Sequence, residues 1–215
     1  MTPQDVYTLL RDANSPKTCE PFDGHVLACI LASAADESRT GGSFTGALGI
    51  SGPALRRNID RYFPGSTQKL EPFGLDVEPS VDENELCLRE LLWRFRASQT
   101  PLNSLMTFLV ARRATRPNHL WQDLGLANRG ELSRLMLRHF TPLARRNTED
   151  MKWKKFFYRM ICREDGFRMC VAPSCSECSD FEGCFGDESG ESLLARTRFH
   201  GETSNLVYID PAFVQ

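Results

Sequence analysis

The sequence predicts an all-α protein with two related helical units (an internal repeat), followed by a long basic helix and a C-terminal cysteine-rich metal-cluster loop. Apolar residues recur every three or four positions along several segments, which is the period of an amphipathic helix. No segment shows the strict apolar–polar alternation of a half-buried strand. With 215 residues, 41% of them hydrophobic, the chain is long enough to bury a substantial core.

Five segments before residue 141 carry the helical period, and we predict a helix over each. The first is short and almost wholly apolar, whereas the other four place leucine and aromatic side chains on one face. Prolines at 64, 72 and 79 interrupt the pattern, which predicts a linker over 65–85. The five predicted helices are 25–35, 52–63, 86–97, 102–115 and 130–140.

Two parts of the chain resemble one another. Residues 48–64 read LGISGPALRRNIDRYFP, and residues 124–142 read LGLANRGELSRLMLRHFTP. We therefore predict one unit over 1–64 and a second over 86–164, each with a helix, a short helix that ends at Leu-Gly, a turn and a further helix. His139 matches Tyr62, and a ring at both positions favours a packing role for His139.

The long basic helix is predicted over 147–164, NTEDMKWKKFFYRMICRE. Asn147 or Thr148 would cap its N-terminus, and the two acidic residues that follow suit the positive end of the helix dipole. Its predicted buried face consists of Trp153, Phe156, Phe157 and Met160.

Charge is unevenly distributed along the chain, whose net charge is only −2. Residues 111–163 contain 13 basic and 4 acidic side chains, a net charge of +9. Residues 164–192 contain 1 basic and 8 acidic side chains, a net charge of −7. A basic block is usually a solvated helix surface, but one this lopsided also favours binding of an anion or an acidic partner.

His119 lies inside the basic block, in RPNHLWQDLG. The matching place in the first unit, near Ser43, carries no ring, so His119 is a candidate for chemistry as well as for a structural role. Pro117 and Asn118 precede it as residues that start helices. Arginines near a helix N-terminus would suit an oxyanion. The upstream arginines are Arg112, Arg113 and Arg116.

Half of the eight cysteines lie within 15 residues, at the spacing C-x4-C-x2-C-x5-C. The N-terminus lacks the apolar stretch of an export signal, so disulfides are not expected. A loop of exposed free thiols would be prone to oxidation. Four thiolates at this spacing instead predict a metal site over 165–196, and both zinc and an iron–sulfur cluster remain open. The four cysteines are Cys170, Cys175, Cys178 and Cys184.

Several segments together resemble the NifQ nitrogen-fixation family. They are RPNHLWQDLG, ELSRLMLRHF, MKWKKFFYR, APSCSECSDFEGCFG and GESLLAR, and the resemblance is dense over 101–196 and looser over 20–64. It implies an iron–sulfur protein that binds molybdenum and donates it for biosynthesis of the nitrogenase iron–molybdenum cofactor, as an assembly factor and not as an enzyme. It assigns Cys170, Cys175, Cys178 and Cys184 as cluster ligands.

The resemblance also implies the cofactor and the partners. The cluster would be of the 4Fe-4S or 3Fe-4S type, convertible to a molybdenum–iron–sulfur cluster, with molybdate as the molybdenum source. The expected partners are the nitrogenase cofactor scaffold complex and the nitrogenase iron protein, in the cytoplasm. Molybdenum in a mixed cluster needs further ligands, and we predict Cys162 and His119 for this role. The tail at 197–215 lies outside the resemblance.

Membrane and nucleic-acid partners are not expected, since no apolar run approaches the roughly 18 residues of a membrane span. Two other function classes remain open on the residues alone. A zinc-stabilised helical module could bind a protein or nucleic acid through its basic face, although its repeats lack the basic recognition helix of a DNA reader. A redox enzyme could use the cluster for electron transfer, but no dinucleotide fingerprint or phosphate loop supports a second cofactor.

Overall fold

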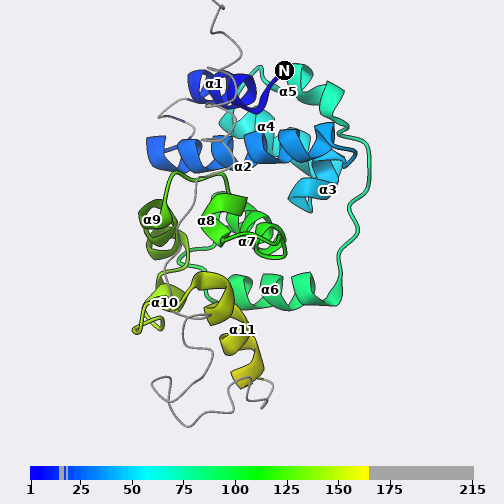
Figure 1. The fold of residues 1–215 in the computed structure, drawn as a ribbon. Coiled ribbons are helices and arrows are strands. Elements are labelled where there is room, and N and C mark those ends of the chain that lie inside the picture. The colour runs from blue at the N-terminus through cyan, green and yellow to red at the C-terminus, as the bar shows by residue number, and fades with distance from the viewer. Residues whose placement is uncertain (15–16, 18, 165–215) are drawn as a thin grey trace, which may run out of the picture.

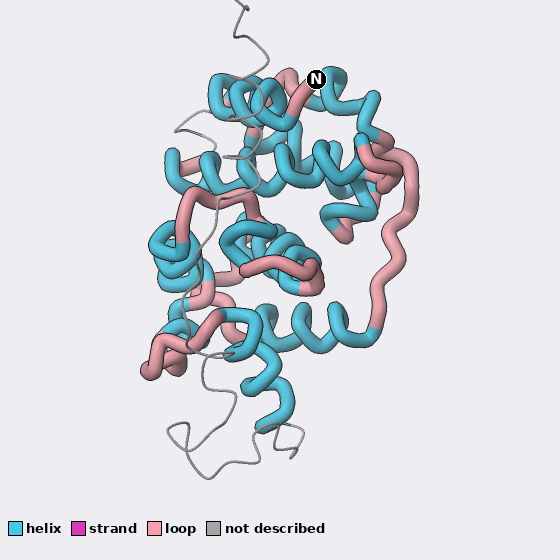
Figure 2. The backbone as a smooth tube through the Cα atoms, viewed as in Figure 1, coloured by secondary structure: helices cyan, strands magenta, loops and turns pink. Residues whose placement is uncertain are grey.

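The computed structural model describes residues 1–14, 17 and 19–164, without the side chains of 162–164, and every element in this part of the chain is helical (Figures 1 and 2). The all-α prediction is confirmed for these residues. None of their helices has the length and apolar composition needed to cross a membrane. The elements are α1 (Pro3–Ala13), α2 (Pro21–Arg39), α3 (Phe44–Leu48), α4 (Gly52–Tyr62), α5 (Thr67–Leu70), η1 (Glu71–Phe73), α6 (Glu83–Arg94), α7 (Pro101–Ala114), α8 (Leu120–Asp123), α9 (Arg129–His139), α10 (Thr141–Ala144) and α11 (Trp153–Glu164).

The helices surround one hydrophobic core, which both predicted units share. In Figure 1, α7 is seen nearly end-on between α2 above and α6 below. Leu31 of α2, Ile59 of α4 and Leu109 of α7 line one small buried cavity, so side chains from both units meet there. Burial of apolar surface between the units is therefore a main source of the stability of the fold.

The order of elements is the same in the two units. Helix α2, short helix α3 and helix α4 in the first correspond to α7, α8 and α9 in the second. The Leu-Gly turn is present in both, with left-handed glycines at Gly49 (φ 66°) and Gly125 (φ 73°). Ser43 and His119 are the N-caps of the two short helices. The common origin of the units stays a prediction.

Several elements have no counterpart in the sequence prediction. Helix α1 begins at a capping box in which the Thr2 hydroxyl accepts from the Asp5 backbone N–H (3.2 Å) and the Asp5 carboxylate accepts from Thr2 N–H (2.7 Å). The predicted linker at 65–85 contains α5 and η1, and its Leu70 and Leu75 are fully buried. The segment from η1 to α6 then runs as the long loop in Figure 2.

The predicted start of the long helix at 147 is wrong, because α11 begins at Trp153. The Asn147 side chain forms two hydrogen bonds with the backbone of Met151, accepting from its N–H and donating to its carbonyl, both at 2.9 Å. Asp150, with φ 52°, turns the chain inside that loop. These local bonds compete with the helix. The predicted buried face is confirmed for Trp153, Phe156, Phe157 and Met160.

His139 has the predicted structural role, but it acts through hydrogen bonds as well as packing. Its Nε2 lies 2.9 Å from an Asp23 carboxylate oxygen, and its Nδ1 lies 3.0 Å from Asn103 Oδ1. Asn103 uses its amide N–H to donate to the His139 carbonyl oxygen (2.9 Å), so Oδ1 is its acceptor. Through these contacts His139 links α9 to α2 and α7.

We expect Asp23→Asn to lower the free energy of unfolding by about 2 kcal/mol at pH 7, since it weakens charge-assisted hydrogen bonds. Burial raises the pKa of Asp23, but hydrogen bonds from His139 and Arg138 outweigh it, so the pKa lies below its ordinary value of 3.8. The stabilisation is therefore full above pH 3.8 and is lost as the pH falls through the lowered pKa.

Urea unfolding between pH 7 and pH 3 tests this expectation. The difference between the wild type and Asp23→Asn should shrink toward the acid end of that range. Asp12→Asn, which removes an exposed carboxylate paired with Arg11, is the matched control and should change little at any pH. A difference for Asp23→Asn that stays constant down to pH 3 would contradict the role given to its charge.

Candidate metal-handling site

The four predicted cluster ligands, Cys170, Cys175, Cys178 and Cys184, lie outside the described residues, as do the predicted segment at 165–196 and the tail. Cys162 lies in α11, and its side chain is not among those described. Over the described residues, no three His, Cys, Asp or Glu side chains are grouped so that they could hold a metal ion. These ligand assignments therefore stay predictions, and the described part of the site is the helix that leads to the cysteine segment.

The first turns of α11 are held firmly on the helical body. Trp153 and Phe157 are buried in the core. The Lys154 ammonium donates to the Asp123 carboxylate (2.5 Å) and to the carbonyl oxygen of Arg116. Burial lowers the pKa of Lys154, while the hydrogen bond with Asp123 opposes that shift. Helix α11 is thus anchored beside α8.

His119 lies next to this anchor. It is the N-cap of α8, which begins at Leu120 and not at Pro117 or Asn118 as predicted. Its carbonyl oxygen accepts from Asp123 N–H (3.0 Å), and its own N–H donates to Gln122 Oε1 (3.1 Å). The structure therefore brings the His119 loop to the first turn of α11.

Cys162 lies further along the same helix. It follows Lys154 by eight residues, which is about 12 Å of helical rise. The described structure therefore does not bring the two predicted accessory ligands together, since His119 lies beside the first turn of α11 and Cys162 in its last.

The arginines upstream of His119 do not form a free anion site. Arg113, whose side chain is fully buried, and Arg116 both donate to the Glu37 carboxylate of α2, the latter at 2.7 Å. Arg112 donates to buried Glu85 of α6 at 2.6 Å. Carboxylates from other helices therefore neutralise much of the basic block, and the predicted role of these arginines in holding an oxyanion is not supported.

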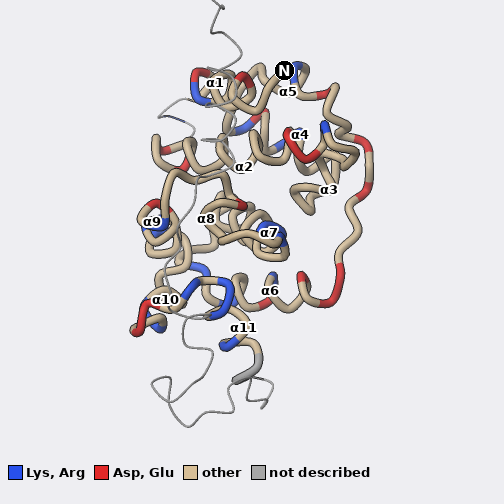
Figure 3. Tube along the Cα trace, viewed as in Figure 1, with Lys and Arg blue, Asp and Glu red and all other residues tan. Residues whose placement is uncertain are grey.

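Among the described residues, positive charge without a carboxylate partner lies instead at the end of α10; Figure 3 shows basic residues around α10 and the start of α11. Arg145 and Arg146 are exposed, and within the described part of the chain neither forms an ion pair. The Arg146 guanidinium lies over the Phe95 ring, 4.3 Å from its centroid. Cation–π packing positions this guanidinium without neutralising it.

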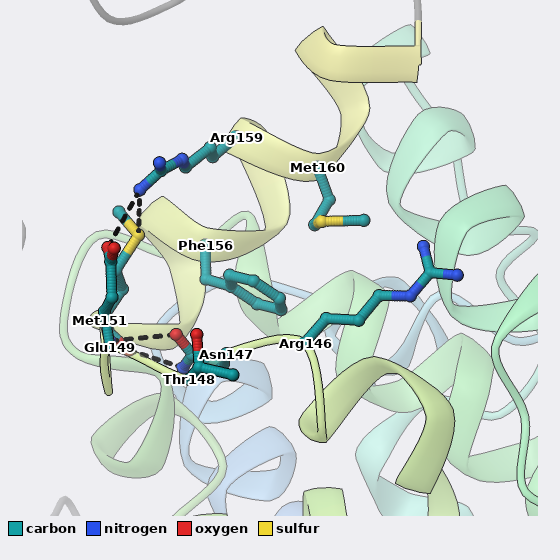
Figure 4. A pocket seen from close by; sticks show the side chains of 8 residues that line it. All are labelled: Arg146, Asn147, Thr148, Glu149, Met151, Phe156, Arg159 and Met160. Atoms are coloured by element: carbon teal, nitrogen blue, oxygen red, sulfur yellow. Dashed lines mark hydrogen bonds and ion pairs between the residues drawn. The ribbon is translucent and has the colours of Figure 1, made fainter. Parts of the chain in front are cut away.

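A cavity of about 160 Å³ opens at this place, between the 146–151 loop and α11 (Figure 4). Arg146 and Arg159 lie on opposite sides of Phe156. Arg159 donates to Glu149 (3.4 Å) and contacts the Met151 sulfur (3.1 Å). Two guanidinium groups and one carboxylate leave a net positive site of a size that suits a small oxyanion.

Sequence reasoning did not identify this cavity. Arg146, Glu149 and Met151 come together only because the Asn147 loop replaces the predicted helical turn. The signal that could have found it is the run Arg145–Arg146–Asn147, in which a turn-forming residue follows two cations.

Comparisons with known proteins identify the family. The sequence model named NifQ matches residues 26–186, a range that contains His119, Cys162 and all four clustered cysteines. A protein NifQ homolog of Sinorhizobium fredii is 41% identical over 186 residues, which cover 84% of this chain and 79% of the relative. Protein NifQ of Rhodobacter capsulatus is 40% identical over 166 residues, which cover 75% and 89%.

Protein NifQ of Azotobacter vinelandii gives a shorter match. It is 43% identical over 101 residues, which cover 47% of this chain and 52% of the relative. No solved structure matches the chain. The match to the family model and the identity to these relatives confirm the resemblance, and the chain belongs to the NifQ family of nitrogen-fixation proteins.

Proposed function

We propose that this protein binds an iron–sulfur cluster and carries molybdenum, which it donates for biosynthesis of the nitrogenase iron–molybdenum cofactor. The observation that carries the proposal is the extent of the family match, which runs two residues past Cys184 and so includes the whole cysteine motif. Four thiolates are a suitable donor set for an iron–sulfur cluster. The protein would act in the cytoplasm as a donor to the cofactor scaffold complex and the nitrogenase iron protein, and not as a turnover enzyme.

The described residues supply the approach to that site. Arg146 and Arg159 at the 160 Å³ cavity would attract molybdate, a tetrahedral dianion, to the start of α11. When bound, the cluster would supply sulfur ligands for molybdenum. His119 and Cys162 are the proposed additional ligands; because they lie at opposite ends of α11, a single molybdenum atom would be bound by one of them at a time.

Anaerobic purification with metal analysis tests the proposal. The full-length protein should be brown and contain iron and molybdenum, and Cys178→Ser should lose most of both metals. Cys87→Ser is the matched control, because Cys87 is an exposed free cysteine on α6 and should leave both contents unchanged. A colourless protein that contains zinc after iron-sufficient anaerobic expression would overturn the proposal and favour a zinc-stabilised binding module.

The accessory ligands require separate variants. We expect Cys162→Ser and His119→Ala to lower the molybdenum content while the iron content is kept, because the four clustered thiolates remain. His119 also caps α8, so His119→Asn should be measured beside it, since asparagine is a good N-cap. If Cys162→Ser and both His119 variants keep full molybdenum occupancy, the ligand assignment is wrong.

A further inference from the structure

A second cavity, of about 480 Å³, lies between the two helical units. One wall comes from the turn after α3 and from α4 of the first unit. The opposite wall comes from α6 and α7 of the second. None of the lining residues carries a thiol, an imidazole or a carboxylate, so this cavity lacks the ligand types of the proposed metal site.

Its polar lining is strongly cationic. Arg57 and Arg61 are exposed and lie one turn apart on α4, and within the described part of the chain neither forms an ion pair. Asp60 lies between them in sequence, but its carboxylate accepts a hydrogen bond from the Thr67 hydroxyl (2.5 Å). Most other arginines of the described chain have a carboxylate partner. Within that same part these two have none, although the Arg61 guanidinium forms a hydrogen bond with the Tyr62 hydroxyl.

The third arginine is fixed in place. Arg89 donates from Nε to Glu85 (2.9 Å) and from Nη2 to the Gly49 carbonyl oxygen (2.6 Å). Glu85 is fully buried and also pairs with Arg112, so one carboxylate serves two guanidinium groups. This side of the cavity therefore keeps one uncompensated positive charge.

The arginines of the lining come from two elements, α4 and α6, and the apolar part of the lining includes Ile50, Leu105 and Phe108. The Phe108 ring packs against two residues of α6: the Arg89 guanidinium carbon lies 5.0 Å from the ring centroid, and the Trp93 ring centroid lies 6.0 Å from it. The hydroxyl groups of Ser51 and Ser104 also line the cavity and can complete the hydrogen bonds of a bound anion.

We infer that this cavity is a binding site for a small organic anion that carries at least two carboxylate or phosphate groups on an apolar body. Its volume is within the usual range for small-molecule sites and is larger than a lone tetrahedral oxyanion needs. Arginines from two elements, with apolar residues in the same lining, fit anionic groups at two ends of one molecule. The inference goes beyond the proposed function and does not depend on the cysteine segment.

Calorimetric titration of the full-length protein at low ionic strength tests the inference. The probes are adipate, for a dicarboxylate, and hexane-1,6-diol bisphosphate, for a phosphate ligand; each carries its two anionic groups at the two ends. Adipamide has the shape of adipate without its charge, and sulfate is a dianion without an apolar body. At least one of the first two probes should bind at one site per chain and more tightly than adipamide and sulfate, and the better of the two identifies the anionic group.

The double variant Arg57→Gln/Arg61→Gln should weaken that binding by about tenfold or more, since it removes charge-assisted hydrogen bonds. Both side chains are exposed, so the fold should be kept. Arg94→Gln is the matched control, because Arg94 is an exposed arginine of α6 that pairs with Glu90 outside the cavity. Iron and molybdenum contents, measured on the same samples, should be unaffected and so report separately on the metal-donor proposal.

Three outcomes would overturn the inference. One is that neither adipate nor hexane-1,6-diol bisphosphate binds. Another is that the double variant and Arg94→Gln bind equally well. The third is that only an acidic peptide, such as an alternating Glu-Leu dodecamer, binds at Arg57 and Arg61, which would make the cavity part of a protein-docking surface.

Discussion

Gly125→Ala is expected to lower the free energy of unfolding by about 2–5 kcal/mol. Gly125 has φ 73°, a left-handed conformation that strains any residue with a Cβ atom. A Cβ atom there would also lie 2.3 Å from Ser33 Oγ and 2.8 Å from the Cys29 carbonyl oxygen. The carbonyl belongs to the backbone of α2, so the turn after α8 would have to move away from the first unit.

Variants at two other glycines distinguish the backbone strain at positive φ from the close contact with α2. Gly74→Ala, at φ 84° with no atom within 4 Å of the added Cβ, should show the backbone strain alone, about 1–2 kcal/mol. Gly49→Ala, at the matching turn of the first unit, would meet side-chain atoms of Arg89 and Glu85, and no backbone atom as closely, and its loss should fall between the two. Equilibrium unfolding in guanidinium chloride measures the loss of stability of all three variants. Equal losses for Gly125→Ala and Gly74→Ala would show that the close approach to α2 relaxes without penalty.

Glu37→Met is expected to lower the free energy of unfolding by about 3–5 kcal/mol. Glu37 is the carboxylate partner of both Arg113 and Arg116. Arg113 is fully buried, so its charge would lose its counter-ion where water cannot replace it. Methionine keeps nearly the volume of glutamate and removes only its charge and acceptors.

Two further variants test the cause of that loss. Asp36→Asn removes a neighbouring carboxylate that pairs with exposed Arg39, and it should change stability by less than about 1 kcal/mol. Adding Arg113→Met to Glu37→Met should recover part of the stability, because the buried charge is then absent. If the double variant loses the sum of the two single losses, an uncompensated charge is not the reason for the effect.

Local periodicity predicted much of the fold. The predicted helices at 52–63, 102–115 and 130–140 end within one residue of α4, α7 and α9, because their apolar spacing and their caps agree. The helix predicted at 86–97 begins and ends three residues after α6, because α6 starts at its Asp82 cap, before the apolar stripe. The start of α11 was wrong because Asn147 bonds to Met151 instead of capping a helix.

The candidate site was less accessible to sequence reasoning. The basic block is visible in the sequence, but its ion pairs join residues far apart in the chain, such as Glu37 and Arg113. No local pattern encodes such a pair, so the arginines near His119 were interpreted as free for an anion. The cysteine spacing and the family resemblance carry the metal prediction, and both are properties of the sequence itself.

The Glu37 bridge has a consequence for work with fragments. A carboxylate of the first unit, Glu37, pairs with two guanidinium groups of the second, and Asp23 likewise bonds to Arg138 and His139. The first unit thus supplies the negative charge that partners these side chains of the second. A fragment limited to 86–164 would expose cations that the whole chain has already satisfied, and it would bind polyanions with little selectivity. We therefore expect selective binding of an anion to require both units.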